Sequence, residues 1–523
     1  MARNGWDVIV VGAGSSGAVL ASRLAEQGRR TLLLEAGPDF PSAQLPEVWR
    51  SPNPLRALLD PEAGASLVWP GLTATRTDKQ EPALYWRGRG VGGSSSINGQ
   101  IAIRPPMEDF ADWARQGCTG WSPEDVLPCF ARSEDDEQFG DEPYHGRGGP
   151  VPIHRMARAD WGSVDTALHA AALAAGHRGT EDVNAPGASG VSPYPINSRD
   201  GRRVTVNDGY LERARASGRL TVRGGALVDR VLIEHGRAVG VRCLADGAVV
   251  EERADLVVLS AGAVHSPAVL MRSGIGPAGA LRGLGIDVVA DLPVGAGLQD
   301  HPMVGVAIPL DEASALRTAD DRHTNVCVRY TSDAPDALPL DMMFVSLNQN
   351  VLSMEGADLR FGAGAFGVWV NQTYSRGSVT LTSGDPTHHP QVREAMLSDE
   401  RDLSRLRSGL RALVAMARGE EVAAIADGPI DRVNTHLLSI LDDDAQLDDH
   451  LLATAADAQH ATSTCRMGDP ADPDTVVDPD CRVLGVGGLR VVDASILPSV
   501  PRANTNLTAI MAGEMMADRL ARS

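Results

Sequence analysis

Three glycines near the start of the chain have a spacing that suits phosphate binding. Gly12, Gly14 and Gly17 form a Gly-x-Gly-x-x-Gly pattern directly after the apolar segment 7–11. The first glycine permits a tight turn, the second lets backbone approach a pyrophosphate, and the third lets a helix pack on a strand. Glu35 ends the next apolar run, where a carboxylate accepts hydrogen bonds from ribose hydroxyls and repels a 2′-phosphate. The pattern predicts a dinucleotide site for FAD or NAD, not NADP.

The elements that must position this site follow from the hydrophobic pattern. A strand at 7–11, a helix at 18–26 and a strand at 31–35 make one βαβ unit. Further elements are predicted as buried strands at 256–261 and 489–493, a hairpin within 220–244, antiparallel strands at 326–330, 340–347 and 366–370, and helices at 399–418 and 506–520. A parallel sheet and a mostly antiparallel sheet are therefore expected in one α/β chain.

Length and charge exclude several classes of partner. The chain has 523 residues and a net charge of −20, so we expect two or more folding units and no general affinity for nucleic acid or anionic membrane. No apolar run reaches the roughly 18 residues that span a bilayer, and the start has no signal-peptide pattern. These features predict a cytoplasmic protein. Neither the oligomeric state nor a metal site can be inferred from the sequence.

A second glycine-rich segment, 87–99, is more specific than the first. It contains Gly92-Gly93-Ser-Ser-Ser-Ile97-Asn98-Gly, and later segments contain a Gly-Ala-Val-His-Ser-Pro run at 262–267, a Gln-Asp-His-Pro tetrad at 299–302 and a His-x-x-Ser-Thr run from His460. With these motifs, in this order, the chain resembles the glucose–methanol–choline (GMC) flavoprotein oxidoreductases. It is most similar to their 5-hydroxymethylfurfural and aryl-alcohol oxidase branch.

The resemblance implies FAD as the cofactor and assigns residues to it. The fingerprint residues would meet the pyrophosphate, Glu35 the adenosine ribose, and the second glycine cluster the flavin and its ribityl chain. The implied cofactor-binding residues are Gly12, Gly14, Ser15, Ser16, Gly17, Glu35, Gly92, Gly93, Asn98, Val228, Asp493, Thr505 and Asn506.

The resemblance also implies a catalytic pair. Oxidising an alcohol removes a hydride from carbon, which a flavin can accept, and a proton from oxygen, for which histidine is the natural base. His460 matches the family's active-site histidine, although Ser463 replaces a glycine of that motif. Asn504 matches its partner and would orient the substrate oxygen, and Trp369 would line the substrate pocket. His301 is predicted to be a structural histidine.

Two departures from the family pattern affect these expectations. Gln459 stands before the histidine where alcohol-oxidising branches usually have an aromatic residue, so this pocket wall is polar and a preference for aryl or furanic alcohols is in question. Ile97 stands where some relatives attach FAD covalently through a histidine. FAD is therefore expected to bind without a covalent link.

The predicted fold is a Rossmann-like FAD-binding domain, discontinuous over 1–150, 201–302 and 456–523, and a substrate domain over 151–200 and 303–455 with a mostly antiparallel sheet and flanking helices. The predicted activity is oxidation of a primary alcohol, aryl and furanic alcohols included, to an aldehyde. Either O2 or a quinone-type acceptor, as in choline dehydrogenases, would complete the cycle. The motifs leave three further functions open: a redox-silent hydroxynitrile lyase, a light-driven fatty-acid decarboxylase and a non-catalytic FAD-binding protein.

Overall fold

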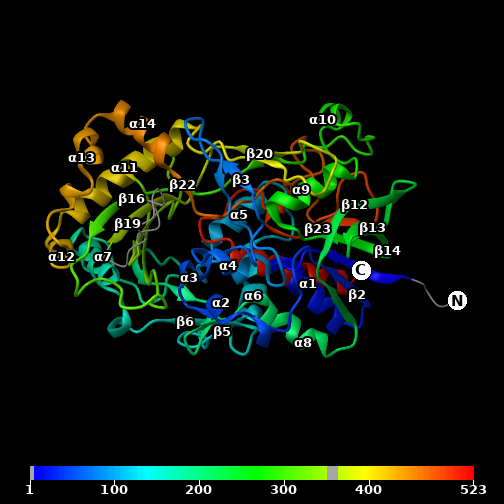
Figure 1. Cartoon of the computed structure of the whole chain (residues 1–523), viewed down its shortest axis with the longest axis horizontal. Helices are drawn as coiled ribbons and strands as arrows, with labels where there is room; N and C mark the ends of the chain where they lie inside the picture. The colour runs from blue at the N-terminus through cyan, green and yellow to red at the C-terminus, as the bar shows by residue number, and fades with distance from the viewer. Residues whose placement is uncertain (1–4, 350–362, 523) are drawn as a thin grey trace.

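A sheet built from both ends of the chain forms one half of the molecule (Figure 1). The computed structural model describes residues 5–349 and 363–522. The strand order is β11-β2-β1-β14-β13-β12, with β23 beside β14, and all pairs are parallel except those of β12 with β13 and β13 with β14. The strands are β1 (Trp6–Val11), β2 (Thr31–Leu34), β11 (Leu220–Arg223), β12 (Ala226–Glu234), β13 (Arg237–Ala245), β14 (Ala248–Leu259) and β23 (Leu489–Val491).

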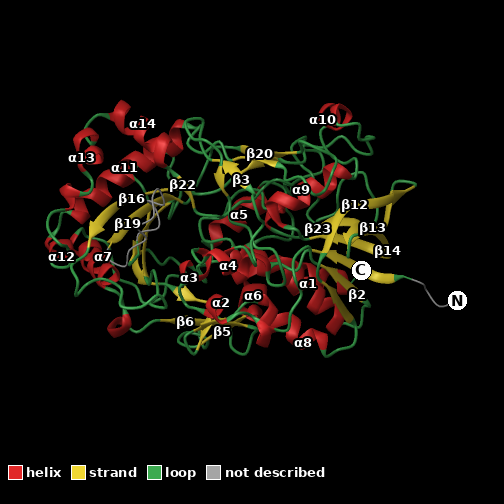
Figure 2. Cartoon of the chain, in the orientation of Figure 1, coloured by secondary structure: helices red, strands yellow, loops and turns green. Residues whose placement is uncertain are grey.

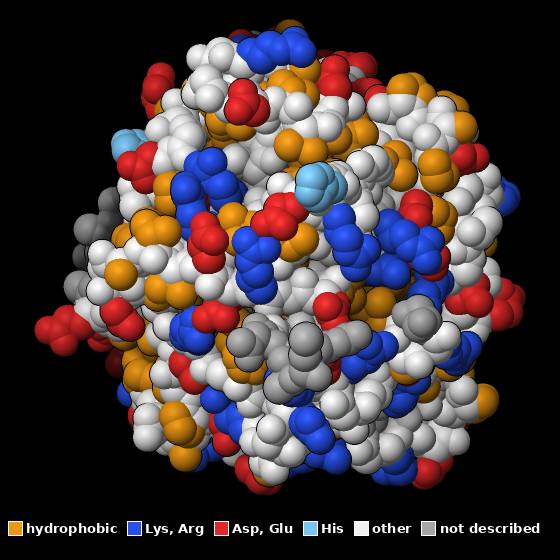
Figure 3. Space-filling model, turned by 90° about the vertical axis from the view of Figure 1, so that its right-hand side faces the viewer, with side chains coloured by type: hydrophobic (Ala, Val, Ile, Leu, Met, Phe, Trp, Pro, Cys, Tyr) orange, Lys and Arg blue, Asp and Glu red, His pale blue; other side chains and the backbone are white. Residues whose placement is uncertain are grey.

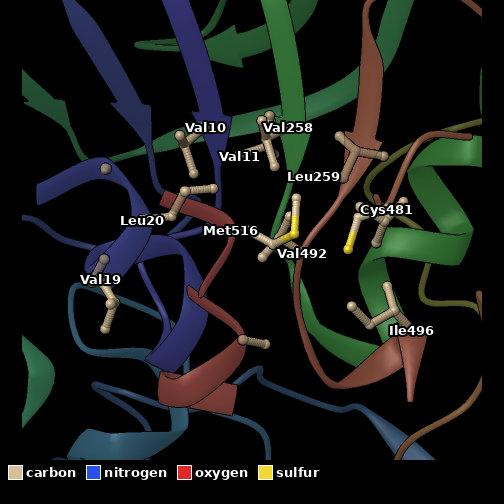
Figure 4. Packing of buried hydrophobic residues seen from close by; sticks show 14 of the residues in the cluster. Val10, Val11, Val19, Leu20, Val258, Leu259, Cys481, Val492, Ile496 and Met516 are labelled. Atoms are coloured by element: carbon tan, nitrogen blue, oxygen red, sulfur yellow. The ribbon is translucent and has the colours of Figure 1, made fainter. Parts of the chain in front are cut away.

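Apolar side chains on both faces explain why this sheet is buried. The first helix, α1 (Ser15–Glu26), packs beside the last, α15 (Asn506–Ala521), although they come from opposite ends of the chain. Figure 4 shows strand residues such as Val10 and Val258 pointing into the same core as Met516 of α15. The close approach needs Gly513, where a Cβ would lie 2.7 Å from the Ser16 carbonyl oxygen. The fold therefore brings the N-termini of both helices to one end of the sheet.

A second, antiparallel sheet forms the other half, with strand order β22-β16-β19-β18-β17-β7. Its strands are β7 (Gly190–Pro193), β16 (Pro302–Pro309), β17 (Val326–Tyr330), β18 (Met342–Leu347), β19 (Ala363–Val370) and β22 (Ala456–Asp457). The helices α7 (Ser163–Ala174) and α11 (Glu400–Ala417) pack on it. Along β19, Phe366 and Val368 join the cluster that contains these helices, whereas Ala365 and Trp369 join a separate cluster. The period of two in a strand thus points Trp369 away from the helices.

A third sheet joins the two halves. It has the order β15-β20-β21-β3-β4, with β15 (Ala296–Leu298), β20 (Gly377–Thr380), β21 (Gln391–Arg393), β3 (Thr73–Thr75) and β4 (Ala83–Leu84). The two largest hydrophobic clusters draw on different segments, one on segments before 295 and after 464 and the other on segments between 164 and 455. The first cluster includes Val151 and Ile153 from the start of the predicted substrate domain. We propose the predicted division on this packing, although residues 350–362 lie outside the described ranges.

The remaining elements are mostly short and surround the sheets (Figure 2). They are α2 (Glu47–Arg50), α3 (Leu55–Leu58), α4 (Pro61–Gly64), α5 (Met107–Arg115), α6 (Pro123–Ser133), α8 (Glu212–Arg215), α9 (Gly262–Arg272), α10 (Ala278–Gly283), α12 (Glu420–Ala423), α13 (Thr435–Ile440), α14 (Asp444–Thr454), β5 (Glu134–Asp136), β6 (Val151–Arg155), β8 (Pro195–Ile196), β9 (Ser198–Arg199) and β10 (Arg202–Arg203).

The predicted α/β fold class is confirmed, with one difference in the hairpin region. The segment 220–244 contains three strands instead of two, because Gly225 adopts a φ of +66° that ends β11 before the hairpin begins. On the face in Figure 3, basic and acidic side chains are interspersed. Among the helices of the described residues, none combines the length and apolarity needed to cross a membrane.

Candidate active site

One cavity of about 1640 Å³ runs from the glycine fingerprint to His460. Its wall includes most of the residues that the sequence assigns to the cofactor and the substrate. Those on the wall are Gly12, Gly14, Ser15, Ser16, Glu35, Gly93, Asn98, Val228, Trp369, Gln459, His460, Asp493, Asn504, Thr505 and Asn506. Gly17 and Gly92 are absent from this wall and support it from behind.

The two glycine-rich segments pack directly against each other. A Cβ on Gly93 would lie 2.6 Å from the Cα of Gly14, and one on Gly17 would lie 2.0 Å from the Gly12 carbonyl oxygen. Gly92, with a φ of +91°, donates its N–H to the Ala13 carbonyl oxygen at 2.9 Å. Glycine is therefore required by backbone contact at Gly93 and Gly17, and by the left-handed backbone at Gly92. Gly14 differs, because a Cβ there meets nothing closer than 3.9 Å, which leaves its backbone open to the cavity.

Two helix N-termini converge on this part of the cavity. Ser15 is the first residue of α1 and Asn506 the first of α15, and the Ser15 hydroxyl donates to Asn506 Oδ1 at 2.8 Å. Asn506 Nδ2 donates in turn to Asn197 Oδ1 at 3.2 Å. Helix N-termini offer unpaired amides and a positive dipole end. The pair suits the pyrophosphate of a dinucleotide.

Glu35 makes three hydrogen bonds to backbone amides in addition to the ribose contact that its sequence position predicts. Its carboxylate accepts backbone N–H groups of Ala13, Gly37 and Gly90, each at 2.9 Å. Burial raises the pKa of Glu35, and these amides oppose the rise. Because a carboxylate has about four acceptor positions, one remains for a ribose hydroxyl. Glu35 therefore ties three loops together as well as lining the cavity.

Asp493 and Asn98 are also fixed by their neighbours. The Asp493 carboxylate accepts the N–H of Gly262 at 2.9 Å and that of Ser495 at 2.8 Å, which ties the C-terminal segment to the start of α9. Asn98 Oδ1 accepts from Arg203 at 3.0 Å. With the open backbone of Gly14 and the paired helix N-termini, these contacts show a cradle that fits FAD.

A chain of hydrogen bonds connects the two histidines with Asn504. His301 Nε2 lies 3.1 Å from the Pro501 carbonyl oxygen, which can only accept, so this nitrogen carries the proton. His301 Nδ1 is then an acceptor and receives the N–H of His460 Nδ1 at 2.9 Å. His460 Nε2 keeps its lone pair, which faces Asn504 Nδ2 at 3.1 Å. These tautomers are assigned from the network, and they leave His460 Nε2 as a proton acceptor.

Burial keeps both rings neutral. Burial is the largest cause that lowers the pKa of His460 well below 6.5, followed by the positive charges that His301 and Arg87 would present. Burial also lowers the pKa of His301 to about 4. Trp369 lies edge-on to His460, with ring centroids 5.9 Å apart, and its buried Nε1 has no hydrogen-bond partner among the described residues. The site thus combines a neutral base with an apolar wall.

His301 is a site residue that the sequence argument assigned to structure. Its place in the Gln-Asp-His-Pro tetrad was the available signal, but its contact with His460 comes from a segment 159 residues away. Gln459 does reach the cavity wall. Its amide nitrogen, however, hydrogen-bonds Asp457, and its backbone has a φ of +64°.

Comparisons with known proteins show which family this chain resembles. The GMC oxidoreductase models match residues 6–303 and 373–513. The chain is 36% identical to the 5-(hydroxymethyl)furfural oxidase of Methylovorus sp. (strain MP688), with 98% of each chain covered. It is 34% identical to human mitochondrial choline dehydrogenase, over 99% of this chain and 90% of that protein. The crystal structure of pyridoxine 4-oxidase from Mesorbium loti matches with a TM-score of 0.87 and 29% identity, over 99% of this chain and all of that one.

The matches confirm the resemblance drawn from the motifs. The named relatives are oxidases and dehydrogenases that act on alcohols, and structures of the family are FAD-dependent flavoproteins. This chain is therefore a member of the GMC oxidoreductase family.

Proposed function

We propose that this enzyme oxidises a primary alcohol to an aldehyde, with His460 as the general base, non-covalent FAD as the cofactor and O2 as the electron acceptor. The observation that carries the proposal is the hydrogen-bond chain from the Pro501 carbonyl oxygen through His301 to His460. The direction of its N–H groups leaves a lone pair on His460 Nε2. A neutral imidazole is the form that accepts a proton.

The residues divide the reaction between them. When bound, FAD supplies the hydride acceptor for the C–H bond of the alcohol. His460 Nε2 takes the hydroxyl proton, and His301 Nδ1 accepts the N–H of the imidazolium that forms. Asn504 orients the substrate oxygen from the other side, because its Nδ2, which lies 3.1 Å from His460 Nε2, can donate a hydrogen bond to that oxygen. Trp369 offers a flat face to the substrate, so aryl and furanic alcohols are the substrates to test first.

Non-covalent binding and the choice of O2 have separate support. Ile97, 5% exposed, packs in a hydrophobic cluster with Trp49 and Leu67 and offers no nucleophile. Oxygen is proposed because the 36% identical relative and the solved structure described above are both named as oxidases.

The test is anaerobic mixing with benzyl and furfuryl alcohols, followed by air, while flavin absorbance is recorded. We expect bleaching by the alcohol and rapid recovery in air, and release of all flavin after acid precipitation. His460→Ala should retain FAD but slow the bleaching about 10²- to 10⁴-fold, the usual contribution of general-base catalysis. Recovery only with a quinone would replace O2 as the acceptor, and no bleaching by any alcohol would contradict the proposal.

A further inference from the structure

Three buried carboxyl groups lie together behind the histidine pair. Asp300 follows β15, Glu394 follows β21 and Asp457 ends β22, and their carboxyl oxygens lie within 4.8 Å of one another. We call these residues the acidic trio. Labels β22, β3 and β20 in Figure 1 mark this region, where the third sheet meets the antiparallel one. None of the proposed steps of the reaction uses the trio.

The trio has one positive charge too few. Arg76 Nε lies 2.6 Å from Asp457 Oδ2, and a guanidinium nitrogen of Arg87 lies 3.6 Å from Asp300 Oδ2. The Tyr85 hydroxyl, 3.4 Å from Asp300 Oδ2, is uncharged because burial raises its pKa. The histidines described above are neutral as well. Two arginines therefore face three carboxyl groups, and a buried unpaired charge is avoided by binding a proton.

Hydrogen bonding shows which member holds that proton. Glu394 is 2% exposed, and neither of its carboxyl oxygens has a hydrogen-bond partner within the described residues. Asp457, in contrast, accepts from Arg76 and from the Gln459 N–H at 3.1 Å. Burial is the largest cause that raises the pKa of Glu394 well above 4.5, followed by Asp457 and Asp300. The proton is therefore assigned to Glu394, because no hydrogen-bond donor among the described residues stabilises its carboxylate form.

Asp300 contacts the backbone of both histidines. Its Oδ1 accepts the His301 N–H at 2.7 Å, and its carboxylate also accepts the N–H of His460. Arg87, which faces Asp300, donates to the Gln459 carbonyl oxygen at 2.7 Å. A single carboxylate thus fixes two backbone segments whose side chains must meet with correct geometry.

We propose that Asp300 is a positioning residue that holds His301 and His460 through their amides, and that a proton on Glu394 keeps Asp300 ionised. This inference rests on the proposed role of His460 as the base. It predicts that the rate of flavin reduction falls on the acid side of about pH 7, which gives the pH profile an acid limb. Burial is the largest cause that raises the pKa of Asp300 to about 7, and the charge of Asp457 is the second. As the pH falls through that value, Asp300 takes up a proton and becomes a weaker acceptor. Titration of His460 cannot give this limb, since its pKa lies well below 6.5.

The test compares Asp300→Asn with a matched control, Asp136→Asn. The Asp136 side chain is fully buried, accepts the N–H groups of Gln138 and Phe139 at 3.0 and 2.8 Å and pairs with Arg155, but belongs to another cluster. In holoenzyme, Asp300→Asn should slow anaerobic flavin reduction by about 10- to 100-fold, as for a catalytic group misplaced by about 1 Å, and should abolish the limb near pH 7. Asp136→Asn should keep both the rate and the limb. A wild-type rate and limb in Asp300→Asn would overturn the positioning role.

A second measurement tests the proton without relying on activity. The infrared spectrum of the holoenzyme at neutral pH should contain the C=O stretch of a protonated buried carboxyl group, and Glu394→Gln should remove it. An absent band, or one bound cation per chain that Glu394→Gln releases, would overturn the assignment of the proton. If alcohols fail to bleach the wild-type flavin while this band is present, the proposed function fails and the assignment of the proton stands.

Discussion

The acidic trio has a counterpart elsewhere in the molecule that differs from it by one charge. Three carboxyl groups are again buried together, but here three cationic groups face them. We call this the balanced cluster, and it consists of Glu134, Asp136, Asp182, Arg104, Arg155 and His145.

Every carboxylate of the balanced cluster has a cationic neighbour. Arg155 bridges Asp136 at 2.9 Å and Asp182 at 2.8 Å, and His145 bridges Glu134 at 2.9 Å and Asp182 at 3.0 Å. Burial opposes protonation of His145, but hydrogen bonds to Asp182 and Glu134 raise its pKa. Burial would raise the pKa of Glu134, and Arg104 with His145 lowers it instead.

The difference lies in what the histidines do. In the balanced cluster a histidine contributes the third positive charge, whereas burial keeps the histidines beside the acidic trio neutral, which suits the proposed role of His460 as the base. The missing third cation of the trio therefore helps to keep His460 neutral, because a further positive charge there would add to burial and to the charge of Arg87, which already lower its pKa. Perturbed carboxyl groups of this kind are typical of active sites.

The largest expected effect comes from making the same change, Glu→Gln, once in each cluster. Glu134→Gln should lower the free energy of unfolding by about 3–5 kcal/mol, because it leaves buried cations unpaired. Glu394→Gln should change it by about 1 kcal/mol or less, because an amide resembles the protonated acid and the Glu394 carboxyl group has no hydrogen-bond partner among the described residues to lose. Urea unfolding with saturating FAD measures both. Similar losses in the two variants would mean that Glu394 is ionised.

Glu35 is a buried carboxylate outside both clusters, and backbone amides, not cations, stabilise it. Glu35→Gln puts an NH2 group where amides now donate, and it removes the proposed charge-assisted hydrogen bond to the ribose, which is worth roughly 1.5–3 kcal/mol. We expect FAD affinity to fall by about one to two decades, measured by titration of the apoprotein. Turnover per bound flavin should be unchanged, since the ribose is remote from the reacting atoms. A collapse of that turnover would contradict the assignment of Glu35.

The pH dependence of stability should also separate the clusters. The pKa of Asp300 is raised from 3.8 to about 7 in the folded protein, so the folded state binds more protons than the unfolded state between these values. Its contribution to stability is present at low pH and is lost as the pH rises towards 7, with a slope of up to about 1.4 kcal/mol per pH unit. Asp300→Asn should remove this slope and Asp136→Asn should keep it. Unfolding free energies from pH 5 to 8 provide the measurement.

The sequence was most informative where local pattern and backbone geometry coincide. The segment 8–11 is apolar throughout and forms a strand buried on both faces. Gly12 has a φ of +100°, and Gly17 is needed by its contact with the Gly12 carbonyl oxygen in the same turn. His460 and Asn504 were found by resemblance, and the structure brings them together. The contacts of His301 and the acidic trio could not be predicted, because they join segments as far apart as Tyr85 and Asp457. Their charge balance depends on burial, which no single motif encodes.

The smallest expected effect concerns Gln459, which connects the acidic trio to the substrate cavity. Its side-chain amide hydrogen-bonds Asp457, and its Oε1 is buried without a partner among the described residues. Gln459→Trp would replace this polar wall with a flat apolar face. Aromatic contacts add about 0.5–1.5 kcal/mol beyond the area they bury, so kcat/KM for benzyl alcohol relative to a diol should rise about twofold to tenfold.

A matched variant separates the aromatic face from the lost hydrogen bond. Gln459→Leu also frees Asp457 from the side-chain amide, while the Gln459 backbone N–H that donates to Asp457 at 3.1 Å is kept in both variants. If the gain in selectivity comes from stacking, Gln459→Leu should leave the benzyl alcohol to diol ratio near that of the wild type. If both variants shift the ratio equally, the effect comes from the acidic trio through Asp457 and not from the pocket wall. An unchanged ratio in Gln459→Trp, with FAD fully bound, would show that this side chain does not contact the substrate.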